Sequence, residues 1–126
     1  MHGALHLAAR SALYLGSGKV SAITLAKEAP RFDPTLPEVM WPTALPQTVS
    51  AIAIGPGLGQ TSDAVRWLEE ALAVSVPLVI DADGLNLLAQ HATLQRAVTE
   101  RRAPTVLTPH PGEAAQLLQT PPREVQ

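Results

Sequence analysis

Three short segments of glycine, proline, aspartate and histidine carry the residue types that could do chemistry, and each follows an apolar run directly. They are Gly55–Gly59 (GPGLG), Asp81–Asn86 (DADGLN) and Thr108–Glu113 (TPHPGE). If the apolar runs are parallel strands, their carboxyl ends share one edge of a sheet, which is where open α/β sheets bind ligands. The sequence therefore predicts that the three segments converge on a single site.

The first segment spaces three glycines evenly, at Gly55, Gly57 and Gly59. It is not a G-x-G-x-x-G fingerprint, because Gln60 stands where the last glycine would fall, and no Lys-Ser/Thr pair follows as in a Walker loop. A strand, a glycine loop and a helix in succession let backbone N–H groups approach an anion at the helix N-terminus. The alternative is a tight strand-to-helix turn without a ligand.

The second segment places two carboxylates, Asp81 and Asp83, just beyond a strand end. They would point the same way if the strand continued. Paired carboxylates could hold Mg²⁺, orient a hydroxyl or accept a proton. The alternative is a helix cap followed by a turn, which accounts for one aspartate but leaves the other, and Asn86, unexplained.

The third segment holds His110 between two prolines, which fix the backbone on both sides and present the imidazole rigidly. Such a ring could stack on a ligand or form a hydrogen bond with it. A position near a helix N-terminus explains Glu113 through the helix dipole, but it explains His110 poorly. We expect no metal site, because the remaining histidines lack ligand-like spacing: His2, His6 and His91.

Hydrophobic periodicity predicts which elements position these segments. Expected helices are His2–Leu15, Thr61–Val74, Leu85–Gln90, Thr93–Arg102 and Glu113–Gln119. Expected strands are Lys19–Leu25, Val49–Ile54, Pro77–Ile80 and Pro104–Leu107, and the five prolines in Ala29–Pro46 predict a connector. Continuous apolar strands alternating with helices predict an α/β fold whose parallel sheet is covered on both faces.

Composition narrows the classes of function. The 126 residues make one domain or part of a larger one, with 9 Lys and Arg against 11 Asp and Glu. A formal net charge of −2 disfavours nucleic-acid binding. The lack of cysteine excludes disulfides and thiolate metal sites and fits a reducing compartment, so we expect a cytoplasmic protein. No apolar run reaches the roughly 18 residues that a membrane span needs, so no membrane partner is expected.

The three segments, in this order and spacing, resemble the ADP/ATP-dependent NAD(P)H-hydrate dehydratases. The resembling stretches are IAIGPGLGQ, VIDADGLNLLA and VLTPHPGEAAQLL, together with PEVM at Pro37–Met40 and the helix-to-strand opening at Gly3–Val20. The similarity extends over roughly residues 3–119. It implies a partial ribokinase-like, Rossmann-like layered fold with a mostly parallel sheet flanked by helices.

The resemblance also implies a reaction and a set of site residues. ADP or ATP, with Mg²⁺, phosphorylates the ring hydroxyl of NADHX or NADPHX, and loss of phosphate restores NAD(P)H. Ala4, Gly57 and His110 would contact the hydrate, with Asp81, Asp83 and Asn86 lining the same pocket. Three glycines would shape the loops of this site: Gly55, Gly59 and Gly112.

The resemblance covers only the first half of the family's domain. The family's Lys-Gly segment and Gly-Thr/Ser-Gly-Asp motif, which carry the nucleotide site and the catalytic base, would follow the region that matches Gln126. We therefore expect residues 1–126 to form a partial domain without the catalytic base, inactive alone. Its partners would be a dinucleotide substrate and a nucleotide, within a homo-oligomer or a longer chain with an epimerase domain. The alternatives are a vitamin-precursor kinase fragment and a degenerate fragment without catalysis.

Overall fold

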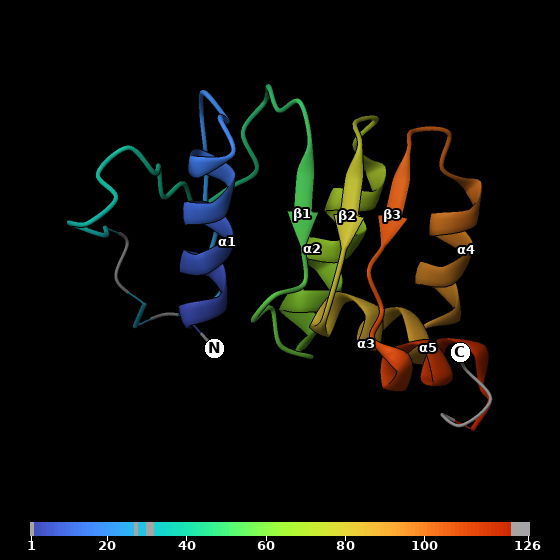
Figure 1. Ribbon diagram of the computed structural model, residues 1–126. Helices are drawn as coiled ribbons and strands as arrows, with labels where there is room; N and C mark the ends of the chain where they lie inside the picture. Colours follow the sequence, from blue (N-terminus) through green and yellow to red (C-terminus); the bar gives the residue numbers. More distant parts are fainter. Residues whose placement is uncertain (1, 27, 30–31, 122–126) are drawn as a thin grey trace. The chain divides into compact units, whose positions relative to one another are not determined.

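A computed structural model describes residues 2–26, 28–29 and 32–121 and divides the chain into two compact units, residues 1–48 and 49–126 (Figure 1). The first unit contains helix α1 (His2–Tyr14). The second contains β1 (Ile52–Ile54), α2 (Ser62–Ala73), β2 (Leu78–Ile80), α3 (Asp83–Gln90), α4 (Ala92–Glu100), β3 (Thr105–Leu107) and α5 (Pro111–Leu118). None of the helices in these described ranges is long and apolar enough to cross a lipid bilayer.

Helix α1 packs its apolar stripe on the segment that follows it, as the periodicity predicts. Its buried Ala9 joins a small cluster with three other buried side chains: Ala22, Leu36 and Val39. The helix ends where Gly16 takes a φ of 96°, a left-handed conformation that suits glycine, and its N–H donates to the carbonyl of Leu13 at 2.9 Å. The helix predicted over His2–Leu15 is therefore confirmed.

The strand predicted over Lys19–Leu25 is wrong: among the described residues, this segment forms one isolated parallel bridge, between Ser21 and Met40. Met40 donates its N–H to the carbonyl of Val20 at 3.0 Å and accepts the N–H of Ala22 at 2.8 Å. The next bond of a parallel ladder would need an N–H on Pro42, which proline lacks. The proline-rich connector thus ends the pairing after one residue, although the strand-forming residues are present.

The second unit is built on a three-stranded parallel sheet in the order β1-β2-β3. Every predicted strand of this unit exists, shortened at its N-terminal side to three residues. The register aligns Ile54, Ile80 and Leu107 as the last residue of each strand. In Figure 1 the three arrows point the same way, with α3 and α5 beyond their tips. The carboxyl ends of the strands therefore share one edge, as predicted.

Buried and exposed side chains alternate along β2, so the two faces of the sheet differ in their exposure to solvent. Leu78 and Ile80 are fully buried, whereas Val79 between them is 37% exposed and its neighbour in β3, Val106, is 53% exposed. Helix α2 packs against β1 and α4, and its buried stripe includes Leu68. The parallel α/β sheet is confirmed. The prediction that helices cover both faces of the sheet is not met within this unit, because the face that carries Val79 and Val106 is exposed.

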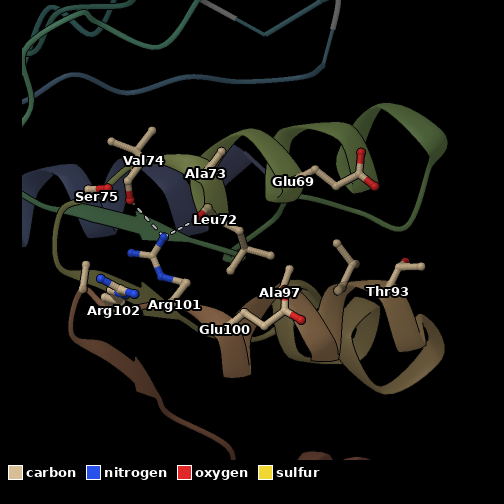
Figure 2. A pocket seen from close by; sticks show the side chains of 12 residues that line it. Glu69, Leu72, Ala73, Val74, Ser75, Thr93, Ala97, Glu100, Arg101 and Arg102 are labelled. Atoms are coloured by element: carbon tan, nitrogen blue, oxygen red, sulfur yellow. Dashed lines mark hydrogen bonds between the residues drawn. The ribbon is translucent and has the colours of Figure 1, made fainter.

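Arg101 joins α2 to β3 at the opposite, amino-terminal edge of the sheet. Its guanidinium lies in an open hollow of about 660 Å³ between α2 and α4 and donates to carbonyls of Leu72 and Val74 (Figure 2). It also donates to the carbonyl of Val76 at 2.7 Å and to the hydroxyl of Thr105 at 2.9 Å. The planar fork of arginine thus satisfies carbonyls that the end of α2 leaves free.

Candidate functional site

The loop after β1 begins with a turn that its sequence prescribes. Pro56 and Gly57 occupy its two central positions, Gly57 has a φ of 71°, and the N–H of Leu58 donates to the carbonyl of Gly55 at 3.0 Å. This is a type II turn, in which proline favours the first central position and glycine the second. The turn leaves Gly57 exposed at the sheet edge where it was predicted to meet a ligand.

Gly55 is required because two stretches of backbone approach each other closely at this position. It is buried, its φ is 125°, and a Cβ added there would lie 1.7 Å from the carbonyl oxygen of Asp81. A Cβ on Gly84, at the start of α3, would in turn lie 3.3 Å from the Cα of Gly55. The two glycines therefore allow the β1 loop to pack directly on the β2 loop, which brings two of the three segments together.

Asp83 connects the same two loops through its side chain. Its Oδ2 accepts the backbone N–H of Gly59 at 2.8 Å in a partly buried position. Asp83 also lies in the first turn of α3, where a carboxylate is favoured by the helix dipole. The glycine loop thus directs an N–H group at an anion, but here the anion belongs to the protein.

The residue between the two aspartates is strained. Ala82 has φ 47° and ψ −120°, a conformation that residues with a Cβ rarely adopt, and it is the N-cap of α3 without a side-chain capping bond. Such a conformation costs on the order of 1–3 kcal/mol and is often found where backbone geometry serves a site. The strain turns the chain sharply out of β2, so that α3 begins only three residues beyond Ile80.

This turn separates the two carboxylates that the sequence suggested as a pair. Oδ1 of Asp81 accepts the hydroxyl of Thr108 at 2.9 Å, which links the β2 end to the β3 end, whereas Asp83 faces the β1 loop. The idea that both side chains point the same way is wrong, because α3 already begins at Asp83 and the strand does not continue. Among the described residues, no group of three or more His, Cys, Asp or Glu could hold a metal ion.

His110 caps helix α5, although a place at a helix N-terminus was expected to explain this residue poorly. Its Nδ1 accepts the backbone N–H groups of Gly112 at 3.0 Å and Glu113 at 3.3 Å. In return, Oε2 of Glu113 accepts the backbone N–H of His110 at 2.9 Å, which completes a capping box. Histidine is missed as a cap because Ser, Thr, Asp and Asn are the usual residues there.

His110 and Asn86 line one open hollow of about 600 Å³ between α3 and α5. More of the surface that lines it is apolar than polar, and Glu113 is the one charged residue among the described residues that line it. The residues that line it are Asn86, His110, Gly112, Glu113, Ala115, Gln116, Gln119, Thr120 and Pro121. The hollow could therefore take a ligand group that packs an apolar surface on its walls and also forms hydrogen bonds.

Hydrogen bonds and packing thus bring the three segments together in sequence along the sheet edge. The β1 loop contacts the β2 loop through Gly59 and Asp83, and the β2 loop contacts the β3 end through Asp81 and Thr108. Asn86 of α3 and His110 line the same hollow. Ala4 lies in α1 of the first unit, and its role in ligand binding stays a prediction.

Two contributors were missed at the sequence level, Thr108 and Gly84. The hydroxyl of Thr108 directly follows β3 and could have been paired with Asp81 from the parallel alignment of the strands. Gly84 was noted only as part of its segment, although a glycine so close to a strand end often marks a close backbone approach. The strain at Ala82 has no signal in the sequence.

Comparison with known proteins shows which family shares these features. The family model described as NAD(P)H-hydrate dehydratase matches residues 1–126. The Coxiella burnetii bifunctional NAD(P)H-hydrate repair enzyme Nnr is 36% identical, over all of this chain and 26% of its own. The Bacillus subtilis ADP-dependent (S)-NAD(P)H-hydrate dehydratase is 35% identical, over all of this chain and 46% of its own.

The fold agrees with this assignment. A crystal structure of the Bacillus subtilis ADP/ATP-dependent NAD(P)H-hydrate dehydratase, co-crystallized with ATP/Mg²⁺ and soaked with CoA, superposes with a TM-score of 0.75 at 30% identity. The match covers all of this chain and 47% of that one, so the chain spans about half the length of this relative. The chain belongs to the NAD(P)H-hydrate dehydratase family.

Proposed function

We propose that this chain forms the hydrate-binding part of an NAD(P)H-hydrate dehydratase. The observation that carries the proposal is the continuous rim at the carboxyl edge of the sheet, where Gly59 binds Asp83 and where Asn86 and His110 share a hollow. In the complete reaction, nucleotide phosphorylates the ring hydroxyl of NADHX or NADPHX, and loss of phosphate restores NAD(P)H. The rim would bind and orient the damaged nicotinamide ring for that reaction.

The described residues do not fit a site for nucleotide and Mg²⁺. Among the described residues, neither lysine nor arginine lines the hollow beside His110. Phosphoryl transfer depends on cationic groups that neutralise the developing charge. We therefore assign no phosphoryl-transfer step to these residues and propose that the catalytic base and the nucleotide site lie outside residues 1–126, within a longer chain or a second polypeptide.

Calorimetry tests the binding half of this proposal. We expect the 126-residue chain to bind hydrated NADH more tightly than NADH, which lacks the ring hydroxyl. Preferential binding of vitamin-precursor alcohols would instead favour a kinase of the ribokinase-like group. Binding of neither class would identify a chain that no longer recognises a substrate.

A turnover assay tests the catalytic half. With hydrated NADH and either ADP or ATP, the chain alone should regenerate no NADH absorbance. Fusion to the C-terminal half of the Bacillus subtilis dehydratase should restore it. Turnover by the chain alone would contradict the assignment of the base to another segment, and an inactive fusion that still binds nucleotide would count against the dehydratase function.

A further inference from the structure

The capping box of α5 does more than end a helix, because it decides which nitrogen of His110 faces a ligand. We propose that it holds His110 as the neutral tautomer with hydrogen on Nε2, and that Glu113 is a positioning residue that aims this N–H at an uncharged acceptor oxygen of the ligand. The inference rests on the proposed function only for the identity of that ligand, the hydrated nicotinamide.

The tautomer follows from the hydrogen bonds to the other nitrogen. Nδ1 of His110 accepts two backbone N–H groups, those of Gly112 and Glu113, so it must carry a lone pair and no hydrogen. A neutral imidazole has one N–H, and it must then be on Nε2. The doubly protonated ring could not accept either bond. Helix capping and ligand binding by His110 are therefore compatible, since they use different nitrogens.

Glu113 holds the ring from its other side. The side chain of Glu113 is only 11% exposed; Oε2 binds the backbone N–H of His110 at 2.9 Å, and Oε1 lies 3.4 Å from Nε2. That separation is too long for a strong hydrogen bond, and the His110 side chain is 68% exposed, so the N–H on Nε2 stays available to an external acceptor. The carboxylate attracts the positive edge of the ring without consuming its donor.

Gly112 keeps the ring in this place. A Cβ on Gly112 would lie 2.9 Å from Cε1 and 3.2 Å from Nδ1 of His110, closer than side chains normally approach. The glycine therefore lets the imidazole fold back over the first turn of α5. A methyl group there would push the ring away from both Glu113 and the helix N-terminus.

The surroundings of Nε2 select an uncharged acceptor. The described residues that line the hollow offer amide and hydroxyl groups at Asn86, Gln116, Gln119 and Thr120. The carboxylate of Glu113 lies 3.4 Å from Nε2. A phosphate would be repelled by Glu113, whereas the carbonyl oxygen of a carboxamide would accept from Nε2–H. The carboxamide of the nicotinamide ring is such a group.

Long-range ¹H–¹⁵N NMR spectra of histidine-labelled protein test the tautomer without any ligand. We expect the His110 signals, assigned by their loss in His110→Asn, to show hydrogen on Nε2. Gly112→Ala should convert them to a mixture of tautomers. Hydrogen on Nδ1 in the unmodified protein would overturn the inference, whatever the protein binds.

Titration then tests the direction of the N–H. Hydrated NADH should shift the Nε2 signal of His110, and inorganic phosphate should leave it unchanged. A shift caused by phosphate alone would overturn the inference. Binding of hydrated NADH without a shift would also overturn it. His110→Asn keeps a good N-cap, so it should leave the unfolding midpoint unchanged while weakening hydrate binding by about tenfold, the loss of one hydrogen bond. If the spectra show hydrogen on Nε2 but the protein does not bind hydrated NADH, the proposed function is overturned and the assignment of the tautomer stands.

Glu113→Gln separates positioning from structure. Glutamine keeps an acceptor for the backbone N–H of His110 but loses the charge beside Nε2. We expect hydrate binding to weaken about threefold to tenfold with the Nε2–H tautomer retained, and the unfolding midpoint to fall somewhat because the first turn of α5 loses a charge. Unchanged affinity in Glu113→Gln would overturn the positioning role.

Discussion

The backbone N–H of Gly59 donates a 2.8 Å hydrogen bond to Oδ2 of Asp83, 24 residues away, and so ties the loop after β1 to the helix after β2. The bond is charge-assisted and partly buried, a combination that makes hydrogen bonds stronger than usual. It joins two of the three segments that the chemistry of the sequence singles out, and it leads to the first prediction.

Asp83→Asn should lower the free energy of unfolding by about 1–2 kcal/mol, because it removes the charge from this bond and from the first turn of α3. Asp63→Asn is the matched control: Asp63 also lies in a first helical turn, but its carboxylate is exposed and pairs with exposed Arg66. The control should change stability by about 0.5 kcal/mol. Urea unfolding measures both, and equal effects would show that the Gly59 contact contributes nothing.

Gly55→Ala should be the most destabilising substitution in its loop, at about 3 kcal/mol or more, since the new Cβ would meet the carbonyl oxygen of Asp81. Gly59→Ala is a control for backbone strain, because Gly59 has a φ of 78° but open space around its Cα. Gly59→Ala should lower the free energy of unfolding by about 1–2 kcal/mol. If urea unfolding gives similar losses for the two variants, the close approach of the loops is not what requires Gly55.

Ala82→Gly should stabilise the protein by about 1 kcal/mol, because glycine adopts the φ of 47° with little strain. The same change at Ala97, inside helix α4, should destabilise it by about 1 kcal/mol. Thermal unfolding of the two variants gives the comparison. Destabilisation by Ala82→Gly would mean that the alanine is not strained where the structure places it.

Acid should loosen the first unit through Asp33. Hydrogen bonds from the hydroxyl and backbone N–H of Thr35, with a further bond from His6, lower the pKa of Asp33 from 3.8 to about 2. A lowered pKa in the folded state stabilises the fold at pH values above 3.8, and this contribution is lost as the pH falls towards 2.

Trp41 reports this loss, because its ring lies 4.9 Å from that of His6. In a Trp67→Phe background, tryptophan fluorescence during urea unfolding should show stability falling between pH 4 and pH 2, and Asp33→Asn should flatten this part of the profile. An unchanged slope in Asp33→Asn would show that another carboxylate governs the acid response.

The fold of the second unit was largely predictable from local patterns. Each apolar run became a strand of the parallel sheet, and Thr61 caps α2 with its side chain as its residue type suggests. The strand expected at Lys19–Leu25 failed for a nonlocal reason, because its ladder depends on the N–H that Pro42 cannot supply. Strand propensity does not indicate which residue will be the partner.

The site was predictable as an edge of the sheet but not as a network of contacts. Parallel strands place Asp81 and His110 near one edge whatever their side chains do. The sequence does not show that Asp83 turns back to Gly59, because that depends on the backbone conformation of Ala82. Nor does it show His110 as a helix cap, since histidine rarely takes that role.

The central claim is that the three strand-end segments form one binding surface for the hydrated nicotinamide, and backbone amide NMR tests it most directly. On titration of the ¹⁵N-labelled chain with hydrated NADH, we expect the largest shifts at Gly57, Asp83 and His110, with saturation at a common concentration. The amide of Arg101, at the hollow between α2 and α4, should stay unchanged. Shifts confined to that hollow, or different saturation at the three segments, would contradict the claim.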